Sequence, residues 1–232
     1  MSEIITLLLI ILTLLTIFCL YKFLDKRGLY FALIIFNIIS FVLSFKISVI
    51  LRLNVNTGII TLIETLSIIY LFMIKSEDKE IKNIMKITFY TNVMTALIIT
   101  TMNYFIPAIT ETISINMQGT FEYNYKILIV YPIIILISQF IITKVYKLIS
   151  IIQNNIPICI ILTYIITSLV YTILFSIIVY INILDFKDSI FIGISTYIMG
   201  IFITIINIIY IKLLTDKKVK KWRMPFLSLL KH

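Results

Sequence analysis

Seven apolar runs, each close to the length that crosses a bilayer, constrain this chain more than any motif. A helix needs about 20 apolar residues to span the hydrocarbon core. Only 13% of the 232 residues are charged, against roughly 25% in a soluble domain. We predict an all-α integral membrane protein with about seven transmembrane helices, a six-helix core plus one N-terminal helix. The runs are Ile4–Tyr21, Gly28–Ile50, Thr57–Ile74, Ile87–Ile109, Ile127–Ile149, Ile156–Leu184 and Ser189–Leu214.

The basic residues alternate between connectors. Connectors one, three and five and the C-terminal tail together carry 16 of the 20 lysines and arginines. Because basic loops stay in the cytoplasm, we predict a multi-pass protein of the plasma membrane with its N-terminus outside and its C-terminus in the cytoplasm. The same distribution accounts for the net charge of +9, so we expect the lipid bilayer, and no nucleic acid, as the partner of these charges.

No linker or change of composition divides the chain into separate globular parts. We assign residues 1–27 to an N-terminal transmembrane helix and the first cytoplasmic connector, 28–214 to a polytopic transporter core, and 215–232 to a basic cytoplasmic tail. The longest outer connector, Thr110–Tyr125, is polar and aromatic. It is interpreted either as a lid over a cavity or as a set of tyrosine anchors at the membrane surface.

Polar side chains inside the apolar runs are the indication of a site. Gln139 lies in the middle of the fifth run, about two turns after Tyr131 and Pro132. An amide in hydrocarbon must find a partner on a neighbouring helix or on a ligand. The same two uses compete for Asn37 in the second run. Tyr131 lies near the outer interface, where it suits either a membrane-surface belt or a cavity wall.

Glu64 is the acidic residue placed well inside a run, and its charge would be costly there unless it is protonated, paired or hydrated. Three interpretations stay open: a proton-coupling carboxylate, a contact to a basic or amide-bearing ligand, and a structural pair with a cation. Lys46, at the outer end of the second run, is the candidate cation, although a lysine that extends to the membrane surface explains it equally well.

The sequence lacks the residues that several kinds of catalytic or metal site require. The one histidine, His232, ends the chain, and no phosphate-binding Gly-Lys-Ser/Thr loop is present. Metal-ligand spacing and nucleophile–histidine pairs are likewise missing. We therefore expect no enzyme and no cofactor, but a protein that binds and moves a small-molecule solute.

Two stretches resemble the vitamin-uptake-type (VUT) family of queuosine precursor transporters. One is YKILIVYPIIILISQFIITKVYKL, in which Tyr131 precedes the Ser138-Gln139 pair. The other is LTYIITSLVYTILFSIIVY, in which Tyr171 and Thr172 precede Phe175. Asn37 followed by Lys46 in the second run also fits the family. The resemblance covers roughly Gly28 to Lys212, and members commonly carry aspartates where this chain has Ile142 and Tyr171.

The resemblance implies a six-helix core that binds a deazapurine-like base, such as preQ0 or preQ1, for tRNA queuosine synthesis. A flat heterocycle needs an aromatic to stack on and polar partners at its edge. Two alternatives remain: a substrate-binding subunit of an energy-coupling-factor transporter, with a partner ATPase or as a homo-oligomer, and a non-transporting membrane scaffold. The expected substrate-binding residues are Asn37, Lys46, Glu64, Tyr131, Gln139, Tyr171 and Thr172.

Overall fold

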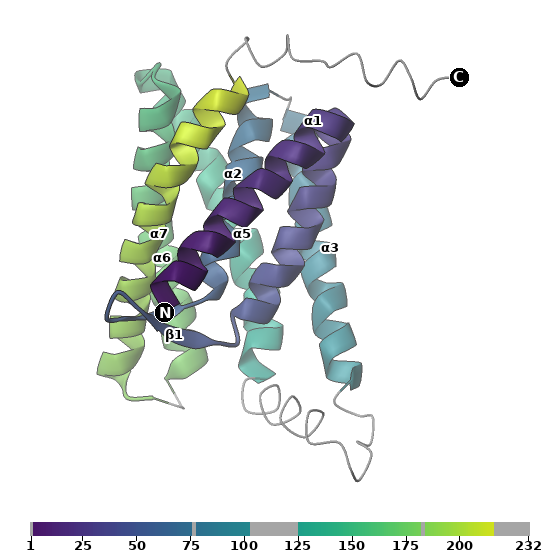
Figure 1. Cartoon of the computed structure of the whole chain (residues 1–232). Helices are drawn as coiled ribbons and strands as arrows, with labels where there is room; N and C mark the ends of the chain where they lie inside the picture. The colour runs from purple at the N-terminus through teal and green to yellow at the C-terminus, as the bar shows by residue number, and fades with distance from the viewer. Residues whose placement is uncertain (1, 76–77, 103–124, 182–183, 216–232) are drawn as a thin grey trace.

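The computed structural model describes residues 2–75, 78–102, 125–181 and 184–215 as a bundle of long helices with one short β-hairpin at one end (Figure 1). The basic tail and nearly all of the outer connector Thr110–Tyr125 lie outside the described residues. The elements are α1 (Ser2–Leu43), β1 (Ile47–Ile50), β2 (Leu53–Asn56), α2 (Gly58–Lys75), α3 (Asp78–Met102), α5 (Tyr125–Ile152), α6 (Ile156–Tyr180) and α7 (Phe186–Thr215).

Helix α1 contains the first two predicted runs, folded back on each other at Asp25. Asp25 has φ 51° and ψ −132°, which interrupts the helix and separates a first arm (residues 2–24) from a second arm (residues 26–43). The arms approach so closely that a Cβ on Gly28 would lie 1.9 Å from the Leu20 carbonyl oxygen. Only glycine fits this position, because any side chain would overlap the backbone of the first arm.

The β-hairpin corrects the prediction for the second run, which was expected to continue as helix to Ile50. The helix ends at Leu43, and Ile47 then pairs antiparallel with Asn56. The turn residues Leu51 and Arg52 both have positive φ, at 52° and 63°. Two central residues with positive φ match the twist of a tight hairpin. A short apolar run rich in β-branched residues suits a strand as well as a helix.

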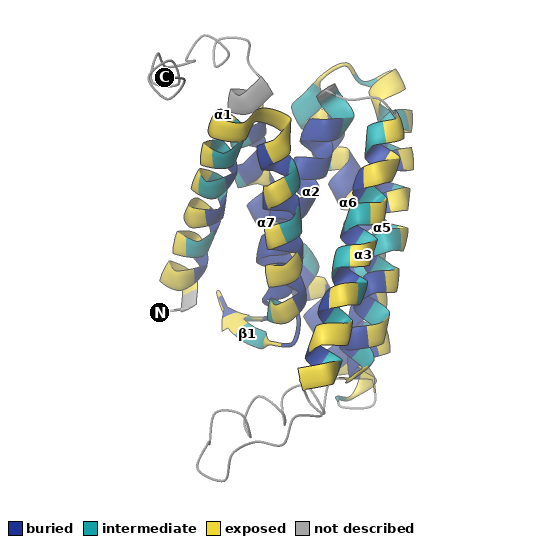
Figure 2. Ribbon diagram, turned by 90° about the vertical axis from the view of Figure 1, so that its right-hand side faces the viewer, coloured by how far each residue is buried: buried dark blue, intermediate teal, exposed yellow. Residues whose placement is uncertain are grey.

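Helix α2 is the centre of the bundle. Every residue from Gly58 to Phe72 is buried, and α2 packs against α1, α3 and α7. A helix that is apolar on all sides is one that protein surrounds. The outer helices show the converse pattern, with exposed faces turned away from the bundle (Figure 2). These faces carry large apolar side chains such as Ile129, Phe140 and Ile209, as lipid contact requires.

Within the described residues, five helices are long and apolar enough to cross a membrane: α1, α3, α5, α6 and α7. Helix α1 is the bent one, and the central helix contributes a shorter apolar segment, Gly58–Ile74. These helices make the chain a multi-pass membrane protein. The later predicted runs correspond to helices with shifted ends. Helix α3 begins nine residues before Ile87, because Lys79, Glu80 and Lys82 continue it beyond the apolar stretch.

The two ends of the bundle differ in charge. The bend of α1 lies at the end opposite the N-terminus and the hairpin (Figure 1). There Lys26 forms a salt bridge of 3.1 Å with Glu80 near the start of α3, which places the first and third basic connectors side by side. Helix α7 also finishes at this end (Figure 1). The exposed Lys26–Glu80 pair contributes little stability, but it shows that the two connectors lie at the same end of the bundle.

Candidate binding site

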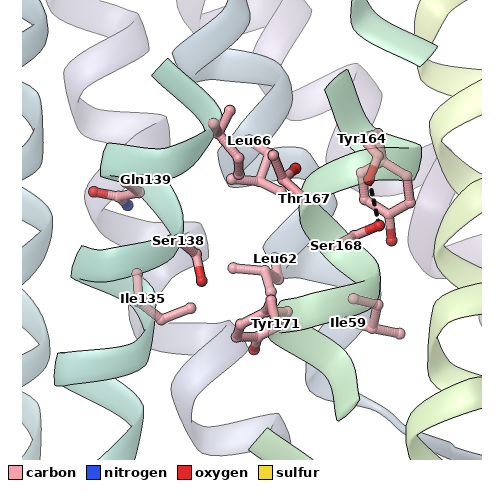
Figure 3. Close-up of a pocket in the computed structure, with 11 residues that line it drawn as sticks. Ile59, Leu62, Leu66, Ile135, Ser138, Gln139, Tyr164, Thr167, Ser168 and Tyr171 are labelled. Carbon is pink, nitrogen blue, oxygen red and sulfur yellow. Dashed lines mark hydrogen bonds between the residues drawn. The ribbon is translucent and has the colours of Figure 1, made fainter. Parts of the chain in front are cut away.

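A small cavity lies between α2, α5 and α6 (Figure 3). Its floor is apolar side chains of α2, and its walls carry hydroxyl and aromatic groups of α5 and α6. Its volume is about 10 Å³, which is about one water molecule. The lining residues are Ile59, Leu62, Leu66, Ile135, Ser138, Gln139, Ile142, Tyr164, Thr167, Ser168 and Tyr171.

Gln139 borders this cavity, but its side chain points away from it (Figure 3). Its Oε1 accepts a hydrogen bond of 2.6 Å from Thr88 Oγ1 on α3, and its Nε2 is buried with no partner in the described part of the chain. The amide therefore holds α5 to α3, which is the helix-joining use that intramembrane amides commonly have.

Asn37 belongs to the same network as Gln139. Its Nδ2 donates to Asn92 Oδ1 at 2.7 Å and to the Thr88 carbonyl oxygen at 3.2 Å. Together these side chains join α1, α3 and α5 through one buried chain of hydrogen bonds. Of the two uses left open for Asn37, the structure shows the link between helices and no contact with the cavity.

Tyr131 is buried and joins three helices at the level between the hairpin and the cavity. Its hydroxyl donates to Ser40 Oγ at 2.7 Å, and Ser40 donates to the Gly58 carbonyl oxygen at 2.8 Å. Its ring stacks on Phe41 with centroids 4.6 Å apart and an interplanar angle of 6°. Tyr131 is therefore buried and not part of a surface belt, but it does not line the cavity either.

Tyr171 is the predicted residue that faces the cavity. It lies between α5 and α6 (Figure 3), and its ring stacks on Phe175 at 5.9 Å, which in turn meets the Tyr131 ring edge-on at 6.0 Å. Thr172, the next residue, is buried but turns its hydroxyl to the Ser168 carbonyl oxygen of its own helix, at 2.9 Å.

Glu64 and Lys46 lie outside this cavity. Successive residues of an α-helix are rotated by about 100°, so Glu64 points away from the face of α2 that carries Leu62 and Leu66 into the cavity. Lys46 is exposed in the turn before β1, where its carbonyl oxygen accepts from Thr57. The expected convergence of Glu64 and Gln139 on one cavity is therefore not what the structure has.

A larger groove opens on the outer side of the same two helices. It lies between α5 and α6 and has a volume of about 280 Å³. Ser138, Thr167 and Tyr171 line both the groove and the inner cavity, so these three side chains form the wall between them. The other groove residues are apolar: Val130, Ile133, Ile134, Ile137, Ile141, Leu174 and Ile178.

Sequence reasoning gave little weight to the hydroxyls of this wall. Ser138 and Thr167 each donate to a carbonyl oxygen one turn earlier in their own helix, at 2.7 Å in both cases. Such bonding makes an isolated serine or threonine uninformative in a sequence. A signal was present in the positions of Thr167, Ser168 and Tyr171, whose spacing of three and four residues places them on one helix face.

No group of three histidine, cysteine, aspartate or glutamate side chains that could hold a metal ion occurs in the ranges the structure describes. Comparison of the chain with protein-family models, with curated proteins and with solved structures gave no match. The site is therefore interpreted from its own geometry.

Proposed function

We propose that this protein is a membrane importer of a small, flat, nucleobase-like or vitamin-like solute that reaches the inner cavity by passing between α5 and α6. The observation that carries the proposal is the shared wall: Ser138, Thr167 and Tyr171 face both the outer groove and the inner cavity. A displacement of these side chains joins the two spaces without breaking the network that holds α5 to α3.

The volumes support a protein that must change shape to hold its solute. Small-molecule sites commonly have 300–1,000 Å³, whereas the inner cavity has about 10 Å³ and the groove about 280 Å³. On this proposal, the inner cavity of about 10 Å³ belongs to a state that is closed around the site. Separation of α5 from α6 would enlarge the cavity, as alternating exposure of a transport site requires.

The chemistry of the wall suits a planar ring with polar edges. Tyr171 and Phe175 offer aromatic faces, and aromatic pairs favour offset stacking. Ser138 and Thr167 already use their hydroxyl protons on their own helices, so their oxygens remain as acceptors for ring N–H groups. A queuosine precursor of the preQ0 or preQ1 type has this combination of shape and donors.

For topology, we propose seven spans, with the two arms of α1 and the short central helix each crossing once. The basic end of the bundle would then lie in the cytoplasm together with the C-terminus, and the N-terminus and hairpin would lie outside, in the plasma membrane. Cysteine labelling from outside intact cells tests this: Val49→Cys in β1 should react with a membrane-impermeant reagent, and Lys82→Cys should not, in a background without Cys19 and Cys159.

Uptake of a labelled deazapurine by cells that depend on its salvage tests the function. Ser138→Leu should fill the wall between groove and cavity and lower uptake at least about tenfold, the equivalent of about 1.4 kcal/mol. Ser150→Leu is the matched control, because Ser150 is exposed on the same helix and bonds its own backbone in the same way. Equal uptake by wild type, Ser138→Leu and a deletion strain would contradict transport and favour the scaffold alternative.

Co-purification of an ATPase with the chain would instead indicate a substrate-binding subunit of the energy-coupling-factor type.

A further inference from the structure

A second buried polar cluster lies on the face of α2 that points away from the cavity. Glu64 and Ser67 of α2 meet Thr13 from the first arm of α1, and Asn207 and Tyr210 from α7. Glu64 has 0% of its surface exposed, and Asn207 has 1%. Three helices therefore place polar side chains around one carboxyl group inside the membrane.

The cluster has more hydrogen-bond acceptors than donors. Asn207 Nδ2 donates to Ser67 Oγ at 3.0 Å, and Thr13 Oγ1 donates to the Ile10 carbonyl oxygen at 2.8 Å. Both carboxyl oxygens of Glu64, Asn207 Oδ1 and the Tyr210 hydroxyl are buried without a partner of full hydrogen-bond geometry in the described residues. The donors left in this set, the Tyr210 O–H and the second N–H of Asn207 Nδ2, are fewer than its unpaired oxygens, and a proton on Glu64 would add one more donor.

The surroundings of Glu64 favour the neutral acid. The polar groups that act on the carboxyl, Asn207 and Thr13, are uncharged. Nearby titratable groups are the Tyr210 hydroxyl on α7 and, beside it, the Cys19 thiol on α1, neither of which is a cation. On the other faces of α2, Tyr70 meets the tyrosines of α5 and α6. An ionised carboxylate here, with no counter-charge beside it in the described part of the chain, would cost several kcal/mol.

A proton suits this cluster better than a metal ion. Sodium sites inside membrane proteins commonly use backbone carbonyl oxygens that an unwound helix sets free. Here Glu64 and Asn207 lie within continuous helices, whose carbonyl oxygens are already paired. The cluster therefore offers side-chain oxygens without the free carbonyl oxygens that such a sodium site uses.

We propose that Glu64 is a proton-binding site, held neutral in the closed state and deprotonated when the first arm of α1 or α7 moves and admits water. Proton binding at Glu64 is argued from the geometry of this cluster alone and does not depend on transport. Its use to drive uptake rests on the proposed function, because only a transporter has a solute to couple. The carboxyl lies on the opposite face of α2 from the cavity, so α2 is the element through which the two sites would communicate.

Infrared spectra of the purified full chain, compared between wild type and variants, test proton binding at Glu64 in the absence of any solute. Wild type should show the C=O band of a buried carboxylic acid at neutral pH. The band should be missing in Glu64→Gln, shifted in Glu64→Asp, and unchanged in the control Glu80→Gln, whose carboxylate pairs with Lys26. Absence of the band from wild type, or its persistence in Glu64→Gln, would overturn the proposal. Loss of the band on replacing choline chloride by sodium chloride at constant pH would instead assign the site to sodium.

Reconstituted vesicles test the coupling. With a deazapurine as probe, Glu64→Gln should retain exchange of labelled for unlabelled solute but lose accumulation driven by an imposed pH gradient, by at least about tenfold. Gradient-driven accumulation at the wild-type level in Glu64→Gln would overturn coupling through Glu64. If wild type itself shows no exchange, the proposed function fails, and the infrared result still decides whether Glu64 binds a proton.

Discussion

Thr88 donates a hydrogen bond from Oγ1 to the Gln139 amide oxygen over 2.6 Å, and this bond joins α3 to α5 inside the bundle. The carbonyl oxygen of the same Thr88 accepts from Asn37, so a single residue of α3 connects to both α1 and α5. The amides that the sequence offers as ligand contacts are thus used to position helices. Because these hydrogen bonds hold α1, α3 and α5 together, α6 is the helix whose movement would open the cavity.

Removing the Thr88 hydroxyl should weaken the attachment of α3 to α5 and lower the stability of the protein. Thr88→Val keeps the shape of the side chain and leaves Gln139 Oε1 unsatisfied, so we expect the free energy of unfolding to fall by about 0.6 kcal/mol, the average for an interhelix hydrogen bond in a membrane, and by at most about 1.7 kcal/mol. Unfolding in mixed micelles with increasing denaturing detergent measures the change. Thr100→Val is the control, because Thr100 bonds its own helix. Similar losses in the two variants would contradict a role in joining α3 to α5.

Gly200 on α7 makes room for the Tyr164 side chain on α6. A Cβ at position 200 would lie 1.8 Å from the Tyr164 hydroxyl oxygen, so Gly200→Ala should destabilise the protein by about 1–3 kcal/mol through overpacking. Tyr164→Phe removes that oxygen, which has no hydrogen-bond partner in the described residues, and should have a small effect alone. Combined with Gly200→Ala it should recover part of the loss. A double variant as unstable as the sum of both single variants would contradict the contact.

Asp25 adopts a backbone conformation that favours glycine. Its φ of 51° with ψ of −132° mirrors the extended region, which glycine reaches readily and other residues reach at a cost. Asp25→Gly should therefore raise the free energy of unfolding by about 1 kcal/mol. Asp25→Ala, which removes the carboxylate but keeps the strain, is the matched control and should give no such gain. Equal effects of the two substitutions would show that the carboxylate, and not the backbone, decides stability at the bend.

The helical membrane class was predictable because apolar runs of about 20 residues leave few other folds. The bend at Asp25 was also predictable, because Lys22, Lys26 and Arg27 separate two apolar runs and indicate a connector between them. The β-hairpin was not, because Ile47–Ile50 is short and apolar and continues the second run, whereas Leu53–Asn56 lies in the connector predicted after that run. Local composition could not show that Leu51 and Arg52 would take positive φ.

The site was harder to predict than the fold. Polar residues within apolar runs were correctly singled out as buried, as Asn37, Glu64 and Gln139 are. Their directions were not predictable, because a side chain's partner depends on which helices pack together. Glu64 and Gln139 lie on α2 and α5, which do meet across the cavity, but each points away from it. The hydroxyls that do face the cavity gave a weak signal, since serine and threonine can satisfy themselves on their own helix.

Equilibrium binding of a 7-deazaguanine-type base to the purified full chain is the most direct test of the central claim, a solute site reached between α5 and α6. Saturable binding of one base per chain is expected, with affinity reduced at least about tenfold in Ser138→Leu and Tyr171→Ala and unchanged in Ser150→Leu. Absence of saturable binding, or equal affinity in all four proteins, would contradict a solute site at the wall that Ser138, Thr167 and Tyr171 form.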